Sequence, residues 1–110
     1  MAENFGLQED TLKKIRTVLA RFGQIQTAIL YGSRAKGNFK TGSDIDLTLT
    51  TAGELTPYFL NRVSTALDDL DLPYTFDLSL LQEIESENLL DHIKRVGIEF
   101  YRAEISPRDN

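Results

Sequence analysis

Residues 31–49 read YGSRAKGNFKTGSDIDLTL, and this stretch decides which fold and which chemistry the chain predicts. It begins with Tyr31, the last residue of the apolar run at 28–31, and Gly32 and Ser33 come next. After ten intervening residues, Asp44 and Asp46 open a second run in which polar and apolar residues alternate. A strand, a small-residue turn, a polar loop and an acidic second strand therefore follow one another within a short distance.

The rest of the chain alternates between helical and extended patterns. Apolar residues recur with helical spacing over 9–22, 54–70 and 86–96, and a short helical turn is expected at 33–37. Strands are expected at 26–31, 44–50, 73–80 and 98–101. This order predicts an α/β (α+β) protein with a single domain over residues 1–110, in which the tail 106–110 is flexible.

The composition is that of an ordinary globular protein, with 41% hydrophobic and 26% charged residues. No apolar stretch is long enough to cross a bilayer, so no membrane association is expected. The chain has no cysteine, which excludes disulfides and thiolate metal sites. A net charge of −5 argues against direct nucleic-acid binding by this chain alone. We expect a cytoplasmic protein.

The acidic pair is the first candidate site. Residues i and i+2 of a strand point the same way, so Asp44 and Asp46 present two carboxylates to one side, about 7 Å apart along the backbone. Oxygen ligands at this spacing suit one or two hard divalent cations. An isolated Asp-x-Asp is more often only the polar side of an exposed strand, and that alternative stays open for the pair alone.

A third carboxylate strengthens the metal hypothesis. Asp77 lies on the polar side of the expected strand at 73–80. If this strand is the neighbour of the one that carries Asp44 and Asp46, three carboxylates converge. Like charges held close together are destabilising unless a cation compensates them.

The turn at Gly32 and Ser33 is the candidate phosphate site. Glycine lets the backbone approach a ligand closely, and the free N–H groups that open a helical turn suit phosphate oxygens. The turn is neither a P-loop nor a dinucleotide fingerprint. Arg34, Lys36 and Lys40 add positive charge beside it, although such residues also occur in solvated loops. Turn and carboxylates together predict an enzyme that handles a metal-bound triphosphate.

These residues resemble the signature of the DNA polymerase beta nucleotidyltransferase superfamily: Gly-Ser, a spacer, Asp-x-Asp, and a third Asp on a later strand. The matching positions are Gly32, Ser33, Asp44, Asp46 and Asp77, with Arg34, Ala35 and Gly37 in the long form of the motif. The chain is most similar to the stand-alone minimal nucleotidyltransferases of bacteria and archaea. The resemblance implies a polymerase-beta-like fold, a small mixed β-sheet flanked by helices.

The resemblance also implies roles for these residues. Gly32 and Ser33 are expected to contact the β- and γ-phosphates of a nucleoside triphosphate, with ATP as the donor. Asp44 and Asp46 are expected to bind two Mg2+ ions, and Asp77 to complete the catalytic metal site. Arg34 or Lys36 is expected to neutralise charge on the departing pyrophosphate.

Other residues have simpler interpretations. His92 is the only histidine and is interpreted as a structural residue of the helix at 86–96. Tyr58 falls at a core spacing, and Pro57 fits the first turn of the helix at 54–70. The acidic run Glu83, Glu85, Glu87 and Asp91 is interpreted as a solvated helix face, with a basic partner as the alternative.

The acceptor is expected on another protein, because the chain has no room for the acceptor-binding domains of larger superfamily members. The resemblance implies a helical HEPN-type partner. The leading hypothesis is an antitoxin that transfers AMP from ATP to a tyrosine of a HEPN toxin. One alternative is a catalytic subunit that nucleotidylates a small molecule or RNA end presented by a helical subunit. The other is a non-catalytic antitoxin that acts by binding.

Overall fold

The computed structural model describes residues 4–104, so the tail at 106–110 lies outside the described residues. The elements are α1 (Glu9–Ala20), β1 (Ile25–Tyr31), α2 (Ser33–Lys36), β2 (Ile45–Thr51), α3 (Phe59–Asp68), β3 (Phe76–Leu80), the 3-10 turn η1 (Leu81–Glu83), α4 (Glu87–Val96) and β4 (Ile98–Arg102). Within residues 4–104, none of the helices has both the length and the apolar character needed to span a membrane.

The four strands form one mixed sheet in the order β3-β2-β1-β4. β1 runs antiparallel to both of its neighbours, β2 and β4. β2 and β3 are parallel, and α3 makes the crossover between them that a parallel pair requires. The predicted fold class, a small mixed sheet flanked by helices, is confirmed.

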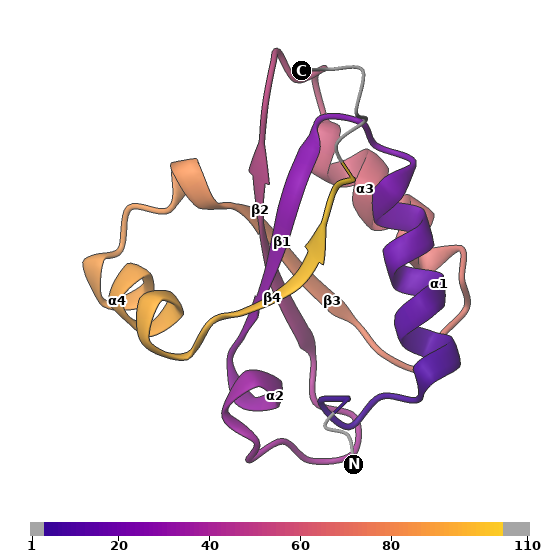
Figure 1. Cartoon of the computed structure of the whole chain (residues 1–110), viewed down its shortest axis with the longest axis vertical. Helices are drawn as coiled ribbons and strands as arrows, with labels where there is room; N and C mark the ends of the chain where they lie inside the picture. The colour runs from indigo at the N-terminus through magenta and orange to yellow at the C-terminus, as the bar shows by residue number, and fades with distance from the viewer. Residues whose placement is uncertain (1–3, 105–110) are drawn as a thin grey trace.

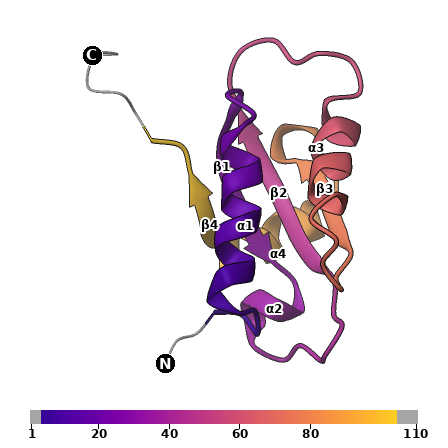
Figure 2. The same ribbon diagram turned by 90° about the vertical axis from the view of Figure 1, so that its right-hand side faces the viewer.

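The helices cover the two faces of the sheet unequally. α1 and α3 lie together on one face, whereas α4 lies on the other (Figures 1 and 2). Ile45, Leu47 and Leu49 point to the face of α1 and α3 and are fully buried. Because side chains alternate along a strand, Asp46 points to the opposite face, the one on which α4 lies. The core and the candidate site are thus built on opposite sides of β2.

The third helix is shorter than its apolar pattern predicts. It begins at Phe59, because the preceding Tyr58 adopts a left-handed conformation with φ of 62° that cannot continue a helix. Pro57 therefore lies in the turn before the helix and does not occupy its first turn. Tyr58 is 79% exposed, so its interpretation as a packing residue is wrong.

Candidate active site

Two of the three predicted carboxylates face each other across neighbouring strands. Asp46 of β2 pairs with Asp77 of β3 in the parallel register, so both side chains lie on the face opposite α1 and α3. Burial, and after it the negative charges of Asp77 and Asp44, together raise the pKa of Asp46 from 3.8 to about 6. The repulsion that the sequence predicts between these groups is therefore present in the folded chain.

Asp44 lies one residue before β2 and is exposed. Its carboxylate accepts a hydrogen bond from the hydroxyl of Thr75, the residue that precedes β3. As the side chains are placed over residues 4–104, no three acidic, histidine or cysteine side chains are close enough to hold one ion.

The chemistry of this set nevertheless fits magnesium. All three groups supply carboxylate oxygens, the ligands that this hard cation prefers. The raised pKa of Asp46, caused by burial and by two neighbouring carboxylates, shows an excess of negative charge that a divalent cation would offset.

Gly32 joins the turn to the carboxylates. It has φ of 76°, a left-handed conformation that favours glycine, and it caps the N-terminus of α2. A Cβ atom added here would collide with the carboxylate of Asp46. The turn and the acidic pair therefore pack directly against each other, with no space for a side chain at position 32. Ser33 follows as the first residue of α2 and is half-buried.

Arg34 has contacts that differ from the expected one with phosphate. Only 3% of the residue is exposed. Its Nε and Nη2 donate to the carbonyl oxygen of Ser43 at 3.1 and 2.9 Å, and its Nη1 donates to that of Phe5 at 2.9 Å. The guanidinium also lies over the rings of Phe39 and Tyr74, 5.1 and 5.0 Å from their centroids. Arg34 thus holds the residue that precedes Asp44, while Lys36 on the same helix is exposed.

Two residues at this site were not singled out for it from the sequence. His92 of α4 accepts a hydrogen bond at its Nε2 from the backbone N–H of Gly32, at 3.2 Å. Its ring meets that of Tyr31 edge to face, at 6.1 Å and 81°. Burial raises the pKa of the Tyr31 phenol, a hydrogen bond to Ser79 opposes this, and the charges of Asp77 and Asp46 add to the rise. Tyr31 and His92 therefore line the same face as the carboxylates.

No sequence signal identified His92, because 60 residues separate it from Gly32. Only the path of the chain across the sheet face opposite α1 and α3, here called the open face, brings α4 to the glycine turn. Tyr31 was interpreted as part of an apolar strand, which it is, but its phenol lies beside the acidic pair.

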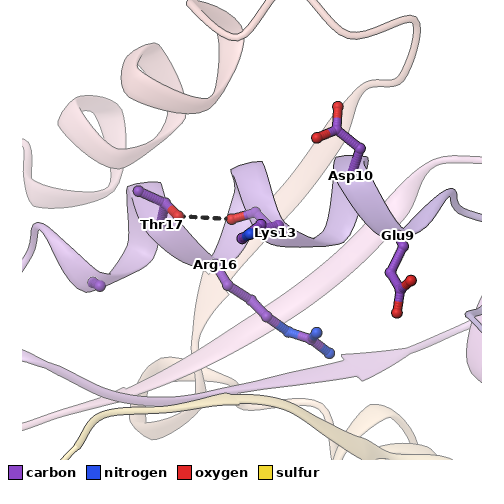
Figure 3. A pocket seen from close by; sticks show the side chains of 6 residues that line it. Glu9, Asp10, Lys13, Arg16 and Thr17 are labelled. Atoms are coloured by element: carbon purple, nitrogen blue, oxygen red, sulfur yellow. Dashed lines mark hydrogen bonds between the residues drawn. The ribbon is translucent and has the colours of Figure 1, made fainter.

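Other surface features lie apart from this site. A broad hollow beside α1 is lined by Glu9, Asp10, Lys13, Arg16, Thr17 and Ala20. Figure 3 shows the carboxylates of Glu9 and Asp10 pointing away from each other, while Thr17 donates to the Lys13 carbonyl of the same helix. The acidic run at 83–91 is exposed, but Glu83 lies in η1 and Glu85 precedes α4, so its interpretation as a single helix face is wrong. Asp91 pairs with Arg95 one turn along α4. Neither feature brings together groups that resemble a catalytic constellation.

Comparison with known proteins gives the same family as the motif. The sequence model of the polymerase beta nucleotidyltransferase family matches residues 13–105, most of the chain. A curated relative from Haemophilus influenzae, named "Probable protein adenylyltransferase MntA", is 29% identical over 92 residues, which cover 84% of this chain and 80% of the relative.

Solved structures share the fold. A crystal structure of a toxin–antitoxin with AMP-PNP has a chain that is 25% identical, with a TM-score of 0.64 over 89% of this chain and 76% of that one. A complex of tri-AMPylated Shewanella oneidensis HEPN toxin with its MNT antitoxin gives a TM-score of 0.63 at 22% identity, over 94% of this chain and 76% of that one. At this last level of identity the likeness shows the fold alone.

Proposed function

The chain belongs to the polymerase beta nucleotidyltransferase family, and we propose that it is a magnesium-dependent adenylyltransferase that serves as the antitoxin of a HEPN/MNT pair. In this proposal it transfers AMP from ATP to a tyrosine of a HEPN-family partner. The observation that carries the proposal is the packing of the Gly32 turn directly against Asp46, which in turn faces Asp77. The proposed phosphate-binding turn and the proposed metal-binding pair thus lie on one face of the sheet.

The carboxylates of Asp44, Asp46 and Asp77 would hold the two magnesium ions. When bound, such ions neutralise charge on the triphosphate and stabilise the entering and leaving oxygens of an in-line displacement. Residues of the chain itself would orient the donor and accept the proton of the acceptor hydroxyl.

The turn residues would orient the donor. Gly32 and Ser33 would bind the β- and γ-phosphates through backbone N–H groups and the serine hydroxyl, and the exposed Lys36 would approach the pyrophosphate from α2. Arg34 would act indirectly, since its bonds to Ser43 hold the chain next to Asp44.

Asp77 would also serve the acceptor step. Its carboxylate would accept the proton of the attacking tyrosine hydroxyl, whose oxygen then bonds to the α-phosphorus of ATP. The bond from that phosphorus to the bridging oxygen breaks, and pyrophosphate leaves. The product is a tyrosine that carries AMP through a phosphodiester.

Three similar proteins support the choice of donor and acceptor. The Haemophilus influenzae relative is named an adenylyltransferase, and the toxin–antitoxin structure at 25% identity contains AMP-PNP. The structure with a tri-AMPylated HEPN toxin supports a HEPN-family acceptor at the level of the fold. Because this reaction would consume ATP and modify a toxin of the same cell, the proposal implies a cytoplasmic location.

The test follows the label from α-labelled ATP in the presence of magnesium, with and without a candidate HEPN-type partner protein. Label is expected on a tyrosine of the partner. It should be lost in the Asp44→Asn, Asp46→Asn double variant and retained in the control Asp68→Asn, Asp69→Asn, which removes two exposed carboxylates at the end of α3.

Three results would contradict the proposal in different ways. Label in a small molecule or RNA, with none on protein, would replace the acceptor. Tight partner binding without any label would replace catalysis by occlusion. Suppression of the partner that survives in the Asp44, Asp46 double variant would separate the antitoxin function from adenylyl transfer.

A further inference from the structure

We propose that His92 is a triphosphate-binding residue of this site, delivered to the phosphate-binding turn by α4. The inference rests on the proposed function, because it assigns a further ligand for the same ATP. Its basis is a contact between distant parts of the chain: the imidazole Nε2 lies 3.2 Å from the backbone nitrogen of Gly32.

The Gly32 N–H is one of the groups that the turn offers to phosphate. In this structure the N–H donates to the lone pair of His92 Nε2, so the imidazole stands where a phosphate oxygen has to bind. A ligand oxygen that takes over the N–H also becomes the nearest neighbour of Nε2. In the neutral imidazole tautomer that carries its proton on Nε2, this nitrogen is a donor, and both groups can then donate to the same oxygen.

The charges at the site favour this exchange. Asp44, Asp46 and Asp77 gather negative charge beside the turn, and the nearby guanidinium of Arg34 is engaged by two carbonyl oxygens and two aromatic rings. The imidazole would offer a further N–H donor at the turn, where a triphosphate brings several negative charges. Charge-assisted hydrogen bonds of this kind are among the stronger ones in proteins.

Packing alone does not explain the position of His92. The neighbouring Ile93 is 7% exposed and anchors α4 to the sheet. The N-terminus of α4 is capped by Ser86, whose hydroxyl oxygen accepts from the Leu89 N–H at 3.1 Å. The helix therefore has its own anchor and cap, and the half-buried imidazole is placed with one nitrogen on Gly32 and its ring against Tyr31.

The experiment compares the binding of magnesium with AMP-PNP and the binding of AMP, by calorimetry on the purified chain. The variants are His92→Phe, which keeps a ring against Tyr31 but removes both nitrogens, and His92→Ala. The control is Lys94→Ala, which removes an exposed cation from the same helix. We expect both His92 variants to bind AMP-PNP roughly tenfold or more weakly, the scale of one charged hydrogen bond. AMP binding and Tm of His92→Phe should match those of the control.

The opposite results are equally clear. AMP-PNP binding by His92→Phe that equals or exceeds that of the wild type would overturn the assignment, since the imidazole would then only cover the amide. Equal losses for AMP and AMP-PNP would overturn it as well. If His92→Ala does not fold, His92→Phe decides the question. A wild-type chain that binds no AMP-PNP would contradict the proposed function together with this inference.

Discussion

The two faces of the four-stranded sheet differ in what covers them and in what they do. The face under α1 and α3 is apolar, and Ile45, Leu47 and Leu49 of β2 are fully buried there. The opposite face, partly covered by α4, carries Asp46 from the same strand, together with Tyr31 and Asp77 from its neighbours. Successive side chains of β2 thus point alternately into the apolar core and to the face that carries the candidate site. Substitutions one position apart on β2 should therefore have separable effects on stability and on activity.

The open face, opposite α1 and α3, is ordered by hydrogen bonds. The closed face, under α1 and α3, is ordered by apolar packing. Thr48 is fully buried on it, and its hydroxyl accepts from that of Ser79 on β3 at 2.8 Å. Among the described residues, no buried side-chain nitrogen or oxygen lacks a hydrogen-bond partner. Because a buried polar group without a partner is costly, these bonds stabilise a polar surface next to the carboxylates.

The sharpest test of this difference substitutes two adjacent residues, Asp46→Asn and Leu47→Ala. Asp46→Asn removes a carboxylate from the site, and we expect adenylyl transfer to fall on the order of 10²–10³-fold, as for loss of one key charge-stabilising group. Its Tm without metal should stay equal or rise, because the substitution removes repulsion with Asp77 and Asp44. Leu47→Ala should cost about 2–5 kcal/mol of unfolding free energy through loss of buried volume.

The two variants are measured by urea unfolding and by label transfer at a temperature where both are folded. Leu47→Ala should keep most of its activity per folded molecule. A drop in stability of Asp46→Asn as large as that of Leu47→Ala would show that the two faces are not separable.

The closed face could be predicted from the sequence, and the open face only in part. Alternation at 44–50 identified the apolar face of β2, and the motif identified Gly32, Asp46 and Asp77 as neighbours. The start of α3 was misplaced because the helical spacing of apolar residues continues through Pro57, and nothing local indicates that Tyr58 turns left-handed.

The contacts of Arg34 and His92 could not be read from local pattern for a different reason. Arg34 is buried by residues from three separate places in the chain: Phe5, the loop that holds Phe39 and Ser43, and Tyr74. His92 reaches Gly32 across 60 positions. Periodicity reports which side of an element is buried, but not which distant segment buries it.

The second prediction uses Arg34→Lys and concerns the hydrogen bonds that hold the segment before Asp44 in place. Lysine keeps the charge but lacks the fork that binds the carbonyls of Ser43 and Phe5 together. Unsatisfied buried carbonyl groups cost about 1–3 kcal/mol each, so we expect a loss of stability of that order. Adenylyl transfer should fall through kcat, since the segment before Asp44 loosens, whereas KM for ATP should stay within about twofold, because Arg34 is not placed on the phosphate.

Lys36→Ala is the matched variant, because Lys36 lies on the same helix but is exposed. It should raise KM for ATP and leave stability unchanged. A large rise in KM for Arg34→Lys at unchanged stability would instead support the phosphate contact that the family resemblance implies.

The smallest expected effect is a pH dependence of stability that belongs to the open face alone. The pKa of Asp46 is raised from 3.8 to about 6 in the folded chain, by burial first and then by Asp77 and Asp44. Between these two values the folded state binds more protons than the unfolded state, so this group makes the metal-free protein less stable as the pH rises from about 4 to about 6. Above that range its effect is constant. Since the side chain is only half-buried, the change is on the order of 1 kcal/mol once solvent screening is allowed for.

Comparison of the wild type with Asp46→Asn isolates this effect from the other carboxylates of the chain. Urea unfolding in the presence of a chelator should give equal stabilities near pH 4 and an advantage for the variant that grows up to about pH 6. Leu47→Ala should shift stability by the same amount at every pH, because no charge changes on the closed face. A stability difference between wild type and Asp46→Asn that does not vary with pH would mean that the charges around Asp46 are screened in solution, and that the open face carries no electrostatic cost for a cation to offset.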